Sequence, residues 1–354
     1  MTRDEKTLVI LTPGFAKDEA DSTCIPTQQN FVTGLNEIYP ELNIIILALD
    51  YPYSKGTYQW FNNTVISFNG RNKGGLSKLL MRRKVFSTLK KINASNNIIG
   101  LLSFWYGECA LIGKKFADTN SLKHICWIWG QDAKKNNRYV QRIPLRSDEL
   151  AVLSDFLQDE FEKNHGIKPG HIIPAGINTQ LFNTNRKEKD IDIIGAGSLI
   201  PLKQYDIFLE TIARIKKQIP GIKATLIGKG PEKDRLQLLI TQLELQSNVS
   251  LTGELPYHEV LEQMQRAKVF LHPSSYEGFG VVSIEALYAG CHVISFTRPM
   301  KQEIAHWHIV SSKEEMIQKA MAILENPATV YKRVLFCTIR EVAKKMTALF
   351  FKSI

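Results

Sequence analysis

The stretch FLHPSSYEGFGVVSIEALYAGCHVIS, residues 270–295, decides the fold class. An apolar run that ends near His272 predicts a buried strand, and the apolar spacing from Val281 onward predicts a helix. Between them lies a loop with Gly278 and Gly280, which allow the backbone to approach a ligand closely. Because the N–H groups at the start of a helix attract anions, a phosphate can rest at Val281. This order of elements predicts a parallel sheet with a ligand at the carboxyl ends of its strands.

Short β-branched runs alternate with longer helical patterns along the whole chain, which predicts the α/β fold class. Its 354 residues are enough for about two domains. A polar segment without apolar periodicity, residues 178–190, separates two such sets of elements. We therefore expect two Rossmann-like, doubly wound parallel-sheet domains that face a central cleft, one over residues 1–180 and one over residues 190–328. Residues 329–354 are expected to carry a helix, from Thr329 to Phe351, that packs back on the N-terminal domain.

The predicted strands are short and mostly apolar. In the first half they cover residues 7–11, 44–47, 98–103, 124–128, 149–153 and 171–174. In the second half they cover residues 191–194, 224–227, 249–252, 269–272 and 292–295. The predicted helices cover residues 108–116 and 156–164 and begin at Tyr205, Glu232, His258 and Val281.

The composition is that of a globular protein, since 44% hydrophobic and 23% charged residues exclude a disordered or fibrous chain. Five scattered cysteines, none in a CxxC pair, indicate neither a disulfide framework nor a zinc module, and a reducing cytosol fits them best. The apolar run near the N-terminus is far shorter than the roughly 18 residues of a membrane span. We expect neither a signal peptide nor a transmembrane helix.

The net charge of +10 is unevenly distributed, because residues 51–107 contain nine lysines or arginines and no acidic residue. The segment from Arg71 to Lys91 predicts a basic amphipathic helix, with several leucines on one side and Lys78, Arg82, Arg83 and Lys90 on the solvated side. Such a helix either covers its own domain's core or binds an anionic membrane surface, where each cation contributes about 1 kcal/mol. Nucleic acid is not an expected partner, because no nucleic-acid-binding motif accompanies the charge.

Glu277 and Glu285 stand eight positions apart, one on the glycine loop and one in the second turn of the helix. Carboxylates placed there can accept hydrogen bonds from sugar hydroxyls, each contributing about 1.5 to 3 kcal/mol. The pair reproduces the E(x7)E signature, and the chain resembles a family 4 glycosyltransferase of the GT-B fold. The resemblance implies that Glu277 contacts the transferred sugar as a catalytic residue and that Glu285 binds the nucleotide ribose. It further implies donor contacts at Gly278, Phe279, Gly280 and Val281.

The segment IIGAGSLIPLKQYD, residues 193–206, resembles the family's Gly-Arg-Leu segment with a downstream lysine, which binds the donor diphosphate. Lys203 falls at that lysine, which implies that it stabilises the leaving diphosphate as a catalytic residue. Ser198 stands where the family has an arginine, so one of two expected cations is absent and the diphosphate must depend more on Lys203 and the loop amides.

Two more segments of the second half are similar to the family's donor site. LIGKGPEKDRL, residues 226–236, resembles a Gly-x-Gly-Pro turn that brings the backbone close to the nucleotide, and TGELPYHEV, residues 252–260, resembles the loop that lies against the base. The donor contacts that they imply are Gly228, Lys229, Gly230, Glu254 and Leu255.

The first half carries two weaker matches. TPGF, residues 12–15, resembles the family's glycine loop, which implies that Gly14 faces the donor phosphate and the acceptor. WGQDAKKNNRYV, residues 129–140, follows a strand where many relatives have His-Gly-x-Asp, but Trp129 replaces the histidine. Asp132 is therefore expected to bind or deprotonate the acceptor as a catalytic residue, and an N-cap role is the alternative.

The resemblance implies a retaining, metal-independent glycosyltransferase of the hexosyltransferase type, without a cofactor, acting in polysaccharide or glycolipid assembly at the cell surface. Its expected partners are a nucleotide-sugar donor, a glycan or lipid-linked acceptor and an anionic membrane surface that meets residues 71–91. The expected location is the cytoplasm, peripherally at the inner face of the membrane. The alternatives are a nucleotide-sugar epimerase or hydrolase on the same fold and a non-catalytic sugar-binding protein. A nicotinamide-dependent oxidoreductase is disfavoured because Ile200 replaces the third glycine of its fingerprint.

Overall fold

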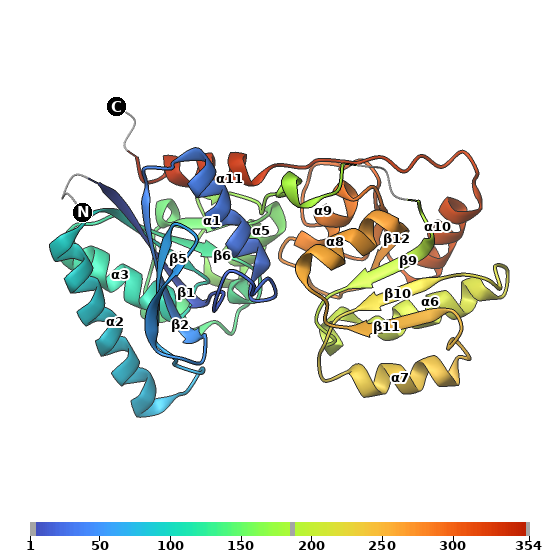
Figure 1. The fold of residues 1–354 in the computed structure, drawn as a ribbon, viewed down its shortest axis with the longest axis horizontal. Coiled ribbons are helices and arrows are strands. Elements are labelled where there is room, and N and C mark those ends of the chain that lie inside the picture. Colours follow the sequence, from blue (N-terminus) through green and yellow to red (C-terminus); the bar gives the residue numbers. More distant parts are fainter. Residues whose placement is uncertain (1–4, 185–187, 352–354) are drawn as a thin grey trace. The chain divides into compact units, whose positions relative to one another are not determined.

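The computed structural model describes residues 5–184 and 188–351, which form two compact units. The first unit comprises the chain up to Gly176 together with the segment from Ile339 onward, and the second unit is Ile177–Thr338. Each unit consists of one sheet and the helices that cover it (Figure 1). Every neighbouring strand pair is parallel except β3 with β4, so the α/β class predicted from the sequence is confirmed.

The sheet of the first unit has eight strands in the order β3-β4-β2-β1-β5-β6-β7-β8. The strands are β1 (Lys6–Gly14), β2 (Asn43–Tyr51), β3 (Gly56–Trp60), β4 (Asn63–Ser67), β5 (Asn97–Phe104), β6 (His124–Ile128), β7 (Leu150–Val152) and β8 (His171–Ile172). The helices are α1 (Pro26–Ile38), α2 (Gly75–Ser95), α3 (Glu108–Asn120), α4 (Arg138–Arg142), α5 (Asp155–His165) and α11 (Ile339–Ala348). The central strand β1 is buried on both faces, which explains its uninterrupted apolar run.

The sheet of the second unit has six parallel strands in the order β11-β10-β9-β12-β13-β14. The strands are β9 (Ile191–Ala196), β10 (Ala224–Ile227), β11 (Val249–Gly253), β12 (Ala267–His272), β13 (His292–Ser295) and β14 (Trp307–Ile309). The helices are α6 (Tyr205–Lys216), α7 (Lys233–Gln242), α8 (Tyr257–Arg266), α9 (Val281–Tyr288) and α10 (Lys313–Glu325). The strand order reverses direction between β9 and β12, and in such sheets ligands bind beyond the carboxyl ends of the strands at this point.

The structure contains a β-hairpin and an edge strand that the sequence analysis did not predict. β3 and β4 pair antiparallel at one edge of the first sheet, inside the segment that we had noted only for its basic charge. Strand β14, which is three residues long, pairs with β13 and forms an edge of the second sheet. Both lie at sheet edges and are short, and short edge strands leave only a weak apolar pattern in the sequence.

The helix expected from Thr329 to Phe351 is shorter than predicted, because residues 329–338 are not helical. In this segment Val334 N–H donates to the carbonyl of Leu287, and the carbonyl of Cys337 accepts from Ile177 N–H. These bonds to distant segments replace the bonds to the preceding turn that a helix requires. The helical part, α11, begins only at Ile339.

Helix α11 packs against α1 within the first unit (Figure 1). Gly34 on α1 lies so close to it that an added Cβ atom would meet the carbonyl oxygen of Ile339 at 2.8 Å. Arg340 pairs with Glu37 at 3.3 Å, and Val342 is buried. The last segment of the chain thus completes the core of the first unit.

The basic helix exists as α2, but two of its cations are not solvated as predicted. Lys78 and Arg82 both pair with Glu108 at the start of α3, and Tyr139 donates its hydroxyl to the same carboxylate. Leu76, at the beginning of α2, is instead exposed, because the apolar face that contacts the core starts only at Met81. The first two turns of α2 therefore extend beyond the core.

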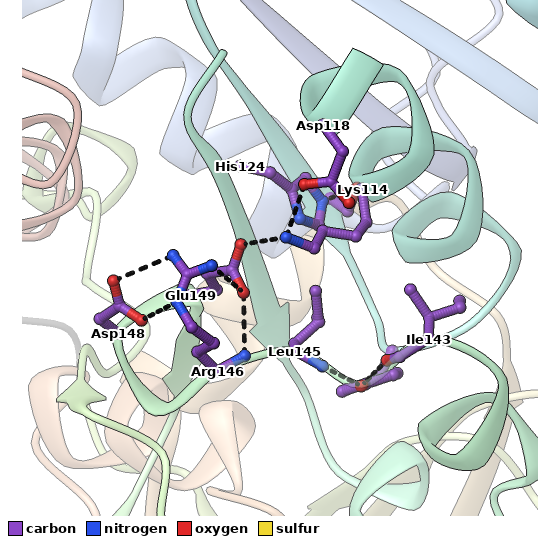
Figure 2. Close-up of polar contacts among 10 residues, drawn as sticks. Lys114, Asp118, His124, Ile143, Leu145, Arg146, Asp148 and Glu149 are labelled. Carbon is purple, nitrogen blue, oxygen red and sulfur yellow. Dashed lines mark hydrogen bonds and ion pairs between the residues drawn. The ribbon is translucent and has the colours of Figure 1, made fainter. Parts of the chain in front are cut away.

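A buried ion pair connects α3 to the segment before β7. Figure 2 shows Lys114 between Asp118 and Glu149, with its Nζ atom 2.7 Å from a carboxylate oxygen of each. Glu149 also accepts the backbone N–H of Arg146 at 2.9 Å. Because Glu149 is buried, its charge depends on these few donors.

We expect Lys114→Met to lower the free energy of unfolding by about 3 kcal/mol, because it removes the ammonium 2.7 Å from a buried carboxylate and leaves only the exposed guanidinium of Arg146, at 3.5 Å. The double variant Lys114→Met/Glu149→Gln should recover most of this loss, since the amide oxygen still accepts from Arg146. Urea denaturation measures both values, with Lys115→Met at the exposed neighbouring position as the control. Equal losses in Lys114→Met and Lys115→Met would contradict this account.

Candidate functional site

Two loops meet at the carboxyl ends of β9 and β12, where the strand order reverses. The loop after β9 contains the short 3-10 turn Pro201–Lys203, and the loop after β12 covers residues 273–280. The carbonyl of Leu202 accepts the backbone N–H of Ser275 at 3.0 Å and the hydroxyl of Ser274 at 3.2 Å. These bonds hold the two loops together as one wall of the site.

Glu277 is a charged carboxylate in this wall. Its Oε1 atom lies 2.9 Å from Nε2 of His272 and forms an ion pair with Lys203. Burial opposes the charge, since the side chain is only 15% exposed, but the bond from His272 and the ammonium of Lys203 outweigh it and lower the pKa of Glu277 to about 2. Lys203, which the resemblance implies to bind the diphosphate, is therefore paired with Glu277 in the structure.

Glu285 has the opposite electrostatic character. It lies on α9, is buried, and accepts the hydroxyl of Tyr257 at 2.6 Å. Burial raises its pKa to about 7, and the bond from Tyr257 opposes part of this rise. The two carboxylates that the sequence pairs therefore differ in protonation near neutral pH.

The start of α9 offers backbone donors to a ligand. Gly280 adopts a left-handed conformation, with φ of 73°, and none of the described side chains caps the helix. The first-turn N–H groups, including that of Val281, can therefore bind an anion. The ring of Phe279 is buried against Phe336, so only its backbone can contact a donor.

The loops after β9 and β10 lie in backbone contact. An added Cβ atom at Gly228 would come within 1.9 Å of the carbonyl oxygen of Gly197, and one at Gly230 within 2.3 Å of that of Leu199. Glycine is therefore required at both positions for packing within the unit, whether or not a nucleotide is bound.

The remaining predicted donor contacts of the second unit lie on its surface. Ser198, in the place of the family arginine, is exposed, and Leu255 is half-buried. Lys229 forms an exposed ion pair with Glu254. An exposed pair of this kind contributes at most about 1 kcal/mol, so Lys229 can exchange Glu254 for a ligand at little cost.

Two predicted site residues, Gly14 and Asp132, belong to the first unit. Gly14 ends β1, where an added Cβ atom would lie 3.2 Å from Cβ of Tyr51. The carboxylate of Asp132 accepts the backbone N–H groups of Tyr106, Trp129 and Gly130 at 2.7–3.3 Å. These bonds hold the loop after β6. Asp132 lies inside the 3-10 turn Gln131–Ala133, whose N-cap is Gly130, so the N-cap alternative is wrong. The catalytic role of Asp132 stays a prediction.

The sequence analysis did not identify three polar residues of the site. His272 and Tyr257 contact the two glutamates, and the buried hydroxyl of Ser283 in the first turn of α9 has no hydrogen-bond partner among the residues that the structure describes. His272 ends the strand directly before the glycine loop, and that position was a usable signal. Tyr257 lies 28 residues before Glu285, and no local pattern links them.

Within residues 5–184 and 188–351, no three His, Cys, Asp or Glu side chains are arranged to hold a metal ion. Of the helices in this same part of the chain, none has the length and apolar character of a membrane span. The expected independence from metals and cofactors stays a prediction.

Comparison with known proteins supports the resemblance for the second unit. Residues 177–333 match the family model described as glycosyl transferases group 1. A stretch of 127 residues, 35% of this chain, is 31% identical to the phosphatidylinositol N-acetylglucosaminyltransferase gpi3 subunit of Schizosaccharomyces pombe. The chain spans only 28% of that relative's length. The superfamily is thus supported, while the assignment to family 4 stays a prediction.

Solved structures establish the fold of the whole chain. Sucrose-phosphate synthase from Thermosynechococcus elongatus has a TM-score of 0.69 at 17% identity, over 97% of this chain and 95% of that one. HepE from Anabaena, in complex with UDP and glucose, has a TM-score of 0.64 at 14% identity, over 98% and 95% of the two chains. The fold is GT-B, as the resemblance implied.

We expect Glu285→Gln to stabilise the protein more at pH 8 than at pH 5. The ordinary pKa of a glutamate is 4.5, and that of Glu285 in the folded protein is about 7. Between these two pH values the unfolded chain has lost the proton of Glu285 while the folded chain keeps it, so the free energy of unfolding falls as the pH rises. Glutamine does not titrate and can still accept from Tyr257, so the gain of the variant should grow by up to about 3 kcal/mol across this interval.

Urea denaturation at both pH values, with the exposed Glu325→Gln as control, measures this gain. A constant difference between wild type and Glu285→Gln would show that Glu285 is charged in the folded protein at both pH values.

Proposed function

We propose that this protein is a glycosyltransferase that moves a sugar from a nucleotide-diphosphate donor to an acceptor hydroxyl. The observation that carries the proposal is the pair Glu277 and Glu285 on either side of an uncapped helix start, at the point where the strand order of the second sheet reverses. The match of residues 177–333 to the group 1 glycosyltransferase model supports it. HepE, with the same fold, binds UDP and glucose, which makes a UDP-sugar the first donor to test.

In this proposal the donor diphosphate lies at the start of α9. The N–H groups near Val281 and the ammonium of Lys203 stabilise the negative charge that develops on the leaving diphosphate. Lys203 is shared between Glu277 and the phosphate, and His272 keeps its bond to Glu277 when Lys203 turns toward the donor. Glu277 then positions the transferred sugar, and the ionised form of Glu285 accepts the ribose hydroxyls.

The finer assignments follow from the same arrangement and from the family resemblance. Lys203 and the amides of α9 supply positive charge to the leaving group, so the transfer proceeds without a metal ion. The resemblance to family 4 enzymes implies a hexose donor and retention of the anomeric configuration. An epimerase, a hydrolase and a non-catalytic binding protein are the alternatives that the experiment below separates from transfer.

We expect Glu285→Ala to weaken UDP binding sharply, because a carboxylate that accepts two ribose hydroxyls is removed. Glu277→Gln should retain UDP binding and lower the rate of transfer about 100-fold or more, because Glu277 meets the sugar rather than the nucleotide. The UDP-induced rise in melting temperature and the release of UDP from a panel of UDP-sugars measure the two effects.

The exposed Glu325→Gln serves as the control and should behave as wild type. Unchanged kinetics of Glu285→Ala with a confirmed donor would refute the assignment. UDP release that needs no acceptor would identify a hydrolase instead.

We further propose that the first turns of α2 bind an anionic membrane surface, where a lipid-linked acceptor would be found. Leu76, Leu79 and Leu80 are 71%, 43% and 45% exposed, and the helical period places them on one face, which Arg83 continues. Lys84 lies beside Lys55, whose hydrogen bond and charge lower the pKa of Lys84. Exposed leucines beside unneutralised cations suit an anionic lipid surface.

Replacing Leu76, Leu79 and Leu80 together by serine should weaken binding to phosphatidylglycerol vesicles at least about tenfold, because three apolar insertions are lost. Flotation measures the bound fraction, with phosphatidylcholine vesicles as the uncharged reference. The control is Leu238→Ser on α7, which is 65% exposed in the second unit. Equal flotation of the triple variant and wild type would contradict the proposal.

A further inference from the structure

The second unit contains a cavity of about 360 Å³ that the donor site does not use. It lies between the loop that follows β13, residues 296–306, and strand β14. Its volume is within the range of about 300–1,000 Å³ that ligand pockets occupy. None of the residues that the sequence analysis assigned to the donor lines it.

One wall of the cavity is the indole of Trp307. The side chains of β14 alternate, so Trp307 and Ile309 line the cavity, while His308 lies 3.0 Å from His292. The indole N–H donates to Ser295 at 2.9 Å. Because this bond satisfies the only polar atom of the ring, the surface that Trp307 offers to the cavity is apolar.

Another part of the cavity lining is polar. Arg298 donates to the carbonyls of Met300 and Lys301, at 3.4 and 3.2 Å, and no carboxylate among the described residues pairs with it. Gln302 and Glu303 line the same cavity. An arginine has five N–H donors, so Arg298 keeps donors for a ligand while the carboxylate of Glu303 supplies acceptors.

We propose that this cavity is a second carbohydrate-binding site, which holds one pyranose unit. A pyranose ring has an apolar face of C–H groups, which matches the indole of Trp307, and a rim of hydroxyls that both donate and accept. The rim matches a guanidinium, an amide and a carboxylate, because each hydroxyl can donate to Glu303 and accept from Arg298 or Gln302. The two opposite charges make a neutral sugar a better ligand than an anion, which Glu303 would repel.

The cavity adjoins the glycine loop of the donor site. The indole of Trp307 reaches to 4.0 Å from the position of a Cβ atom at Gly280, the residue directly before α9. A sugar in the cavity is therefore a neighbour of the proposed donor. We assign it as a further sugar of the acceptor, because none of the residues assigned to the donor lines the cavity. The inference rests on the proposed function for the identity of the ligand as a glycan.

Binding of methyl α-D-glucopyranoside and methyl N-acetyl-β-D-glucosaminide, followed by saturation-transfer NMR and by titration, tests the site. We expect at least one of them to bind, and to bind about tenfold or more weakly to Arg298→Ala/Glu303→Ala, because hydrogen bonds from charged groups are lost. Trp307→Leu should weaken the same binding. The matched control is Arg214→Ala/Glu325→Gln, two exposed positions of α6 and α10 outside the cavity.

The UDP-induced melting shift, measured on the same variants, separates this inference from the proposed function. Cavity variants that lose glycoside binding but keep the UDP-induced melting shift support the second site. If wild type shows no UDP-induced shift, the proposed nucleotide donor is contradicted, but the cavity inference is not. Glycoside binding that persists in the presence of a UDP-sugar supports the second site, and binding that a UDP-sugar displaces would overturn it. No glycoside binding to wild type, or binding that the cavity variants leave unchanged, would overturn the inference.

Discussion

The site of the second unit depends on the contact of one half-buried carboxylate, Glu277, with Lys203 and His272. Glu277 keeps its charge because it contacts both Lys203, in the loop after β9, and His272, the last residue of β12. Burial alone would favour the neutral acid. The contact therefore holds the loop after β9 against the loop after β12. The loop after β12 leads into α9, so the same contact positions the start of this helix, where an anionic ligand can bind.

The pKa of the second carboxylate, Glu285, is shifted in the opposite direction. Glu285 has a single described donor, Tyr257, and its pKa is raised rather than lowered. Two acidic side chains eight residues apart are thus separated in protonation by their surroundings, a pattern common where catalytic or binding groups have different tasks. The hydrogen bond from Tyr257 offsets only part of the cost of burying this acid.

Much of the fold could be predicted because buried parallel strands leave long β-branched runs, as at β1 and β6. The glycine loop before α9 could be predicted for another reason: its glycines and the helix that follows it are adjacent in the sequence. What the sequence could not provide are contacts between distant residues: Lys203 lies 74 positions from Glu277, and Arg82 lies 26 positions from Glu108. Lys203 was expected to bind a ligand and Arg82 to be solvated, but each forms an ion pair with a glutamate. Residues 329–338 were predicted as a helix because the tail is amphipathic, but they are not helical, and their backbone forms hydrogen bonds with Leu287 and Ile177 instead.

The docking of α11 on α1 has a consequence for synthesis on the ribosome. The chain emerges from its N-terminus, and domains generally fold as they appear. Here the apolar surface around Phe31 and Trp127 stays without its cover until Ile339 and Val342 have been made, after the whole of Ile177–Thr338. The unit whose translation starts first is the one whose core closes last, and in that interval its uncovered surface is a natural contact for a chaperone.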